Sequence, residues 1–213
     1  MNDDQVIITG RAGGANLPEG QSDVMRLTRR GALLMAGLHG QFMEASRLGR
    51  VFVASNAVAG VDHGNAFTTT PPICLWNPLG SGVNISILKA VMAYLSGTLG
   101  AVPICWGYTP AQVNAPTTGT ELVPVSALLG SARGSGRAYT GSTLVAAPSI
   151  IRPAFQTGAA LATTVAFSSM CEEINDGELT LPPGVALALQ GAGGAAGTTP
   201  RVIFGIVWEE VPI

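Results

Sequence analysis

The chain has 213 residues, of which 47% are hydrophobic and only 11% are charged, with 28 glycines, 14 prolines and two histidines. General acid–base and metal chemistry draws on convergent His, Cys, Asp and Glu side chains. Here His39, His63, Cys74, Cys105 and Cys171 stand far apart, without the spacing of metal ligands or of a disulfide framework. The composition therefore predicts a structural or binding protein, not an enzyme, with no cofactor and with buried free thiols.

Charge and hydropathy disfavour nucleic acid and membranes as partners and favour other protein subunits. A net charge of −2 leaves no basic stripe of the kind that binds nucleic acid. No apolar run approaches the ~20 residues that a membrane helix needs. A mean hydropathy of +0.38 leaves little polar surface for an isolated globule, so we expect an oligomer or a subunit of a larger shell. All but one of the cations are arginine, which favours protein interfaces.

Residues 1–50 are predicted to form an N-terminal arm with one short helix. Residues 1–24 are rich in Gly and Asp, contain Pro18 and cannot bury enough apolar surface to order alone, so we expect an extended arm. In residues 25–50, apolar side chains repeat at intervals of three and four, as an amphipathic helix requires. These side chains are Leu34, Leu38, Phe42 and Ala45. Glycines confine the helix to the part after Gly40.

Arg29 and Arg30 precede an apolar stretch at 31–38, a pattern that resembles a twin-arginine export signal. The stretch is short, however, and Glu44 and Arg47 follow it without a small-residue cleavage site. We therefore predict no export signal here.

From Val51 to the end, short β-type runs alternate with Gly, Pro, Asn and Thr clusters, which is typical of a sandwich or barrel. The predicted strands are 51–55, 73–76, 85–95, 102–108, 121–125, 150–152, 160–167, 178–181, 185–190 and 201–211. So many short strands without covering helices predict an all-β domain at 51–213, in which two sheets pack face to face.

Three details refine this domain. The turn at Pro182, Pro183 and Gly184 predicts a tight connection between antiparallel strands. The run 202–207 is apolar on both faces, so it should be central or buried at an interface. The Gly- and Ser-rich stretch 126–143 is predicted to be a long mobile loop.

Several motifs have both a functional and a structural interpretation. Gly134, Ser135, Gly136 and Gly141 suggest a phosphate cradle, but no Lys follows at P-loop spacing, so a flexible loop is favoured. The glycines in 191–197 precede a strand and form a loop rather than a dinucleotide site.

Acidic residues raise two further alternatives. Asp62 beside His63 could orient a base, yet a turn with a local Asx hydrogen bond is favoured. The acidic cluster in 172–178 lacks EF-hand spacing, so it is expected to be solvated or to pair with arginines of a neighbour.

The tryptophans Trp76, Trp106 and Trp208 are predicted to pack in a core or interface rather than to stack sugars.

A resemblance to a known family rests on several segments. They are Phe42-Met43-Glu44-Ala45 to Arg50-Val51-Phe52, Ala54 to Ala57, Trp76-Asn77-Pro78 to Ser81-Gly82, Tyr94 to Ala101, and Phe204-Gly205-Ile206-Val207-Trp208-Glu209-Glu210. Over roughly residues 42–213, the chain resembles tailed-bacteriophage virion structural proteins. The resemblance implies a jelly-roll-like sandwich, often trimeric, that decorates capsids as a cement protein or forms head and tail appendages.

The first hypothesis is therefore a capsid decoration protein of the virion surface, assembled in the host cytoplasm, whose partners are the major capsid protein and itself as a homotrimer. Candidate capsid contacts are Arg26, Arg29, Arg30, Arg47 and Arg50, and candidate oligomer packing residues are Phe204, Ile206 and Trp208. The alternative is a tail, fibre or head-appendage protein that recognises a host-surface glycan through loops around Trp76, Trp106 and 126–143. A glycosidase needs two carboxylates ~5–10 Å apart, and the single acidic residue between Asp62 and Glu172 makes that hard to build.

Overall fold

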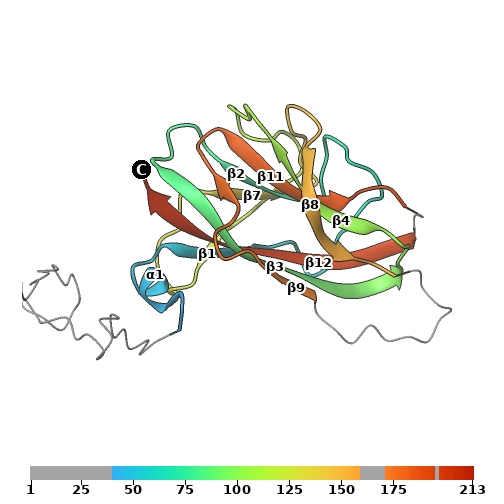
Figure 1. Cartoon of the computed structure of the whole chain (residues 1–213), viewed down its shortest axis with the longest axis horizontal. Helices are drawn as coiled ribbons and strands as arrows, with labels where there is room; N and C mark the ends of the chain where they lie inside the picture. The colour runs from blue at the N-terminus through green and yellow to red at the C-terminus, as the bar shows by residue number, and fades with distance from the viewer. Residues whose placement is uncertain (1–39, 159–170, 195–196) are drawn as a thin grey trace, which may run out of the picture. The chain divides into compact units, whose positions relative to one another are not determined.

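The structure is a computed structural model that describes residues 40–158, 171–194 and 197–213. It is a sandwich of two antiparallel sheets, seen as upper and lower layers in Figure 1. The predicted two-sheet all-β fold is confirmed. No helix in the described ranges is long and apolar enough to cross a membrane.

One layer, called here the β12 sheet, is built around the long strand β12 (Thr198–Pro212). Its order is β10 (Thr180–Leu181), β3 (Val83–Thr98), β12, β1 (Val51–Ser55) and β6 (Val125–Ser126), and β9 (Cys171–Ile174) also pairs with β3. The run 202–207 of β12, which is apolar on both faces, is thus central in its sheet, as predicted.

The other layer is called the β11 sheet after β11 (Val185–Gly191). Its order is β5 (Thr120–Leu122), β7 (Arg137–Thr140), β2 (Ile73–Asn77), β11, β4 (Pro103–Thr109) and β8 (Ser149–Gln156). The free edge strand β8 contains Pro153 and two register shifts against β4, features that blunt an edge against further pairing.

The strand pairs are nested. β1 pairs with β12, β2 with β11, β3 with β9 and β10, and β4 with β8. Counted from the two ends of the sequence towards its middle, successive strand pairs therefore lie alternately in the β12 sheet and in the β11 sheet. This is the connectivity of a jelly roll. The short strands β5, β6 and β7 are added between β4 and β8.

The core lies between the layers and comes from alternate positions of each strand. On β12 the inward side chains include Val202, Phe204, Ile206 and Trp208, all fully buried, and they face Leu187 and Leu189 of β11 within one cluster. Burial of this many large apolar side chains, each worth about 1.5–3 kcal/mol, is the main source of stability.

Four predictions need correction. The stretch 126–143 is not one mobile loop, since it contains β7 and the end of β6. The predicted strand 121–125 is split into β5 and β6, which belong to different sheets, because Pro124 between them has no N–H for a ladder. Pro182–Gly184 joins β10 to β11 across the two sheets rather than within a hairpin. Strand β9 at Cys171–Ile174 was not predicted.

Two other predictions concern the ends of the described ranges. Helix α1 (Met43–Arg47) begins after Gly40, as predicted, but none of its residues is buried. The predicted strand at 160–167 and the arm 1–24 lie outside the described residues.

Candidate interaction surfaces

Of the five predicted capsid contacts, the structure describes Arg47 and Arg50, which lie just before the β domain. Arg47 on α1 is exposed and forms an ion pair with Glu44 at 2.8 Å. Arg50, directly before β1, is exposed, and its side chain makes no hydrogen bond or ion pair with the described residues. Arg26, Arg29 and Arg30 lie outside the described residues. The structure thus leaves Arg50 available for an external carboxylate.

The predicted oligomer packing residues have a different role. Phe204, Ile206 and Trp208 are fully buried in the chain's own core. Their side chains point between the sheets, so they have no surface left for a neighbouring subunit, and that assignment is corrected here. The outward residues that alternate with them on β12 are the ones a partner can reach.

The tryptophans are packed, as predicted. Trp106 and Trp208 are fully buried and Trp76 is 8% exposed. Trp76 Nε1 donates to the Gln112 carbonyl at 2.7 Å, and Trp106 Nε1 donates to Glu173 Oε2 at 2.6 Å. None of these rings offers a free face, so sugar stacking at Trp76 or Trp106 is ruled out as a mode of glycan recognition.

The glycine-rich stretch suspected of cradling phosphate does bind an anion, but the anion is a side chain of this protein. Glu210 is 6% exposed, and its carboxylate accepts hydrogen bonds from the backbone N–H groups of Ser135 and Gly136, both at 2.8 Å. A Cβ added at Gly134 would lie 2.3 Å from Glu210 Oε1, so glycine is needed for this close approach. This contact, called here the Glu210 clamp, orders the predicted loop.

The acidic cluster also finds its partners inside the chain. Arg152 of β8 lies 3.0 Å from Glu173 and 3.3 Å from Glu178, and Lys89 of β3 lies 2.8 Å from Glu172. Arg152 thus joins the edges of the two sheets. Burial raises the pKa of Glu173 above its usual range, while the hydrogen bond from Trp106 and the charge of Arg152 lower it. Within the described residues, no group of three or more His, Cys, Asp and Glu could hold a metal ion.

The predicted Asx turn is confirmed, since the backbone N–H of Gly64 donates to Asp62 Oδ1 at 2.8 Å. His63 is buried, and its Nδ1 lies 2.6 Å from the Gly64 carbonyl. Because a carbonyl only accepts, Nδ1 carries the proton. Nε2 has no hydrogen-bond partner among the described residues.

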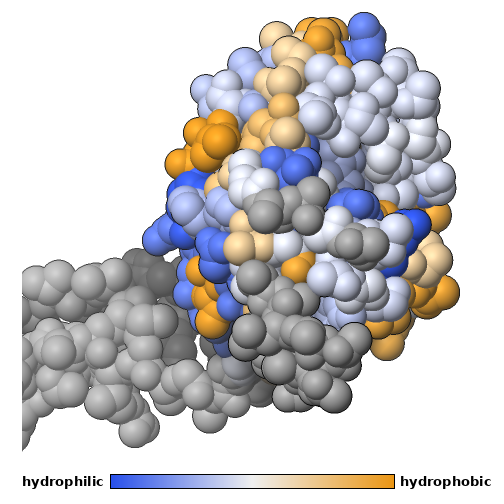
Figure 2. All heavy atoms as spheres, turned by 90° about the vertical axis from the view of Figure 1, so that its right-hand side faces the viewer, coloured by the Kyte–Doolittle hydropathy of each residue, from blue (hydrophilic) through white to orange (hydrophobic). Residues whose placement is uncertain are grey.

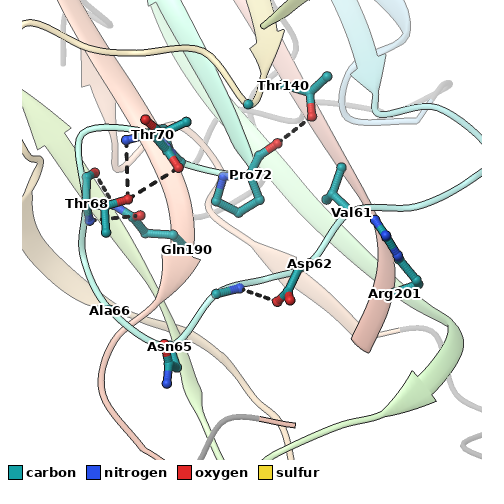
Figure 3. A pocket seen from close by; sticks show the side chains of 13 residues that line it. Val61, Asp62, Asn65, Ala66, Thr68, Thr70, Pro72, Thr140, Gln190 and Arg201 are labelled. Atoms are coloured by element: carbon teal, nitrogen blue, oxygen red, sulfur yellow. Dashed lines mark hydrogen bonds between the residues drawn. The ribbon is translucent and has the colours of Figure 1, made fainter. Parts of the chain in front are cut away.

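An open pocket of about 350 Å³ lies on the other side of this turn (Figure 3). Asp62 and Arg201 line one side, and Thr68, Thr70 and Gln190 line the opposite side. The Gln190 amide exchanges two hydrogen bonds with the backbone of Thr68, both at 3.3 Å. Arg201 is exposed, and no described residue pairs with it. The pocket can therefore offer one cation and one carboxylate to a small polar ligand.

The outer faces of the two sheets differ. On the β11 sheet, the segments 109–119 and 141–148 cover a second apolar cluster made of Cys74, Trp76, Tyr139, Leu144, Ala186 and Ala188. The covering segments hold one another: the Val145 N–H donates to Gln112 Oε1 at 2.9 Å, and Thr117 pairs with Thr143.

The outer face of the β12 sheet has apolar residues, and no described segment covers it in a comparable way. Val53, Val91 and Val207 are only half-buried, Val125 is 53% exposed and Ile174 is 66% exposed. Figure 2, which views the molecule from another side, also shows separate hydrophobic clusters among polar surface. The predicted packing residues Phe204, Ile206 and Trp208 are the inward ones of β12, and the outward ones were not singled out, although the run 202–207 is apolar on both faces.

Comparisons with models of protein families, with curated proteins and with solved structures find no match for this chain.

Proposed function

We propose that this protein decorates and stabilises the head of a tailed bacteriophage, binding the assembled capsid as an oligomer on the virion surface. The observation that carries the proposal is the nested jelly-roll pairing of the strands, an architecture found in viral capsid and lectin domains. The resemblance of residues 42–213 to virion structural proteins supports the same choice.

The contact with the major capsid protein is proposed to involve the arginine-rich start of the chain. Arg50 is exposed and unpaired in the described structure, and Arg47 is exposed beside it. Arg26, Arg29 and Arg30 precede them in the sequence. Arginine binds carboxylates in a bidentate geometry, which suits it to acidic positions on a capsid subunit.

The mechanism is stabilisation by mass action. A ligand that binds only the assembled shell stabilises it by RT ln(1 + [L]/Kd) per site. An oligomer that contacts several capsid subunits at once raises the effective concentration of each contact. No catalytic step is required.

The test is co-sedimentation of the full-length protein with purified capsids that lack it. We expect saturable binding at many sites per capsid, and Arg50→Glu should weaken it about tenfold or more. Arg201→Glu is the matched control, since Arg201 is likewise exposed and unpaired among the described residues. Absence of capsid binding by the wild-type chain, or equal effects of the two variants, would contradict the proposal.

A second candidate function is glycan recognition by a tail, fibre or head-appendage protein, and the observation that favours it is the polar pocket (Figure 3). The ligand would hydrogen-bond to Asp62 and Arg201, not stack on tryptophan. A glycan array probed with wild-type protein and Arg201→Glu tests this function. Binding that Arg201→Glu abolishes and Arg50→Glu preserves would support it, and an array without signal would reject it.

A further inference from the structure

Hydrogen bonds within the chain fix the walls of the polar pocket (Figure 3). On one side, the amide of Gln190, which is 1% exposed, holds the backbone of Thr68 through two hydrogen bonds at 3.3 Å. Thr140 of β7 donates from Oγ1 to the Pro72 carbonyl at 2.7 Å. On the other side, the Asx turn holds the carboxylate of Asp62. Walls that are set before a ligand arrives reduce the ordering cost of binding.

Several polar groups in this pocket have no partner among the described residues. The Asx turn uses Oδ1 of Asp62 and leaves Oδ2 free of described partners. The side chains of Asn65 and Arg201 are exposed and make no hydrogen bond or ion pair with the described residues. The hydroxyl groups of Thr68 and Thr70 add donors and acceptors on the opposite side (Figure 3). Polar groups on two sides suit a ligand that carries several hydroxyl groups.

The charges of the pocket narrow the ligand further. Among the described lining residues, Arg201 supplies one positive charge and Asp62 one negative charge, and the two form no ion pair with each other. A guanidinium binds a planar carboxylate through two parallel hydrogen bonds. A phosphate monoester carries nearly a second charge, for which the described lining offers no second cation and which Asp62 would repel. Charge therefore favours a ligand with a single carboxylate.

The apolar part of the lining suits a sugar ring. It can pack against the C–H groups of such a ring, and it consists of Val61, Ala66, Pro71 and Pro72. None of the described lining residues is aromatic, so a planar base has no ring on which to stack. The volume of about 350 Å³ lies at the lower end of the range for ligand pockets. Because the pocket is open, it can hold one residue of a longer glycan.

We propose that the polar pocket binds an acidic sugar, that is, a monosaccharide residue of a glycan that carries one carboxylate. Arg201 binds the carboxylate, and Asp62 and Asn65 bind hydroxyl groups of the ring. The inference rests on glycan recognition, the second candidate function, and names the class of glycan that this function would select.

The experiment compares matched glycans on an array probed with the full-length chain. The array presents glycans that end in glucuronic acid or sialic acid beside the same glycans with the carboxylate reduced to an alcohol. The wild type should bind an acidic glycan about tenfold or more tightly than its reduced form, because reduction removes the ion pair and keeps the hydroxyl groups. Arg201→Gln should lose this preference and bind both forms equally weakly.

The matched control is Arg50→Gln, since Arg50 is likewise exposed and unpaired among the described residues. This variant should keep the preference of the wild type. Equal binding of acidic and reduced glycans by the wild type, or a preference that survives in Arg201→Gln, overturns the acidic-sugar assignment and leaves glycan recognition standing. An array without any signal rejects glycan recognition itself, and the inference with it.

Discussion

The outer faces of the two sheets of this sandwich differ in how far the described loops cover them. The β11 sheet buries Cys74, Trp76 and Tyr139 under loops that hydrogen-bond to one another. The β12 sheet leaves Val53, Val207 and Ile174 half-buried or exposed. Among the described residues, loops of the chain therefore cover the outer face of the β11 sheet, whereas the outer face of the β12 sheet stays partly exposed.

The largest expected effect comes from breaking the covered face. Trp76→Ala removes a large buried side chain and its hydrogen bond to Gln112, and should cost about 3–5 kcal/mol of unfolding free energy. Ile174→Ala on the open face should cost less than about 0.5 kcal/mol in the monomer. Urea unfolding of both variants at low protein concentration measures the contrast, and equal costs would refute it.

Substitutions of Glu210 test whether the Glu210 clamp orders the segment 133–136 independently of the two outer faces. Glu210→Ala leaves the N–H groups of Ser135 and Gly136 without their acceptor and should destabilise the fold by about 2–3 kcal/mol. Glu210→Gln keeps an acceptor oxygen and should cost less. Chemical denaturation ranks the two variants, and a Glu210→Gln cost as large as that of Glu210→Ala would contradict the clamp.

Thiol labelling compares the sheets in the folded state. Cys74 lies in the covered cluster, where burial raises its pKa to about 12, whereas Cys171 on β9 is half-buried. Because the thiolate is the reactive form, Cys171 should react at least tenfold faster than Cys74 at pH 8. Time-resolved labelling with a disulfide reagent should therefore show one fast thiol, and Cys171→Ser should remove it. A fast phase that survives in Cys171→Ser would show that the cover is open.

The smallest expected effect concerns the ion pair of Arg152 and Glu173, which links the edges of the two sheets. Burial raises the folded-state pKa of Glu173, so the folded protein holds this proton more tightly than the unfolded chain does. The proton's contribution to stability is present below the usual pKa of 4.5 and is lost as pH rises through the raised value. Glu173→Gln should flatten this part of the pH profile of the unfolding midpoint, and a profile unchanged by the substitution would argue against the assignment.

Local patterns were enough to predict most strands. The run 51–55 matches β1, and the predicted 185–190 and 201–211 fall within β11 and β12, because alternation and turn residues act over a few positions. Strand β7 was missed because Gly and Ser around it signal a loop, while its order depends on Glu210, more than seventy residues away. No local rule contains that contact.

The candidate surfaces were harder to predict than the strands. Phe204 and Trp208 were chosen as interface residues because β12 is apolar on both faces, and sequence alone does not tell which face points into the core. The register with β1 and β3 settles that question, because it places Phe204 and Trp208 on the inward side and Val207 on the outward side of the sheet. The acidic cluster likewise needed the fold to bring Arg152 to it.

The most direct test of this account is the mass of the full-length wild-type chain, by sedimentation equilibrium over a hundredfold range of concentration. If the protein binds the capsid as an oligomer, the mass is a multiple of the 21.7 kDa chain mass, with three chains expected from the resemblance, and it falls towards that of single chains on dilution. A single-chain mass at every concentration would contradict the oligomer on which the proposed capsid binding depends.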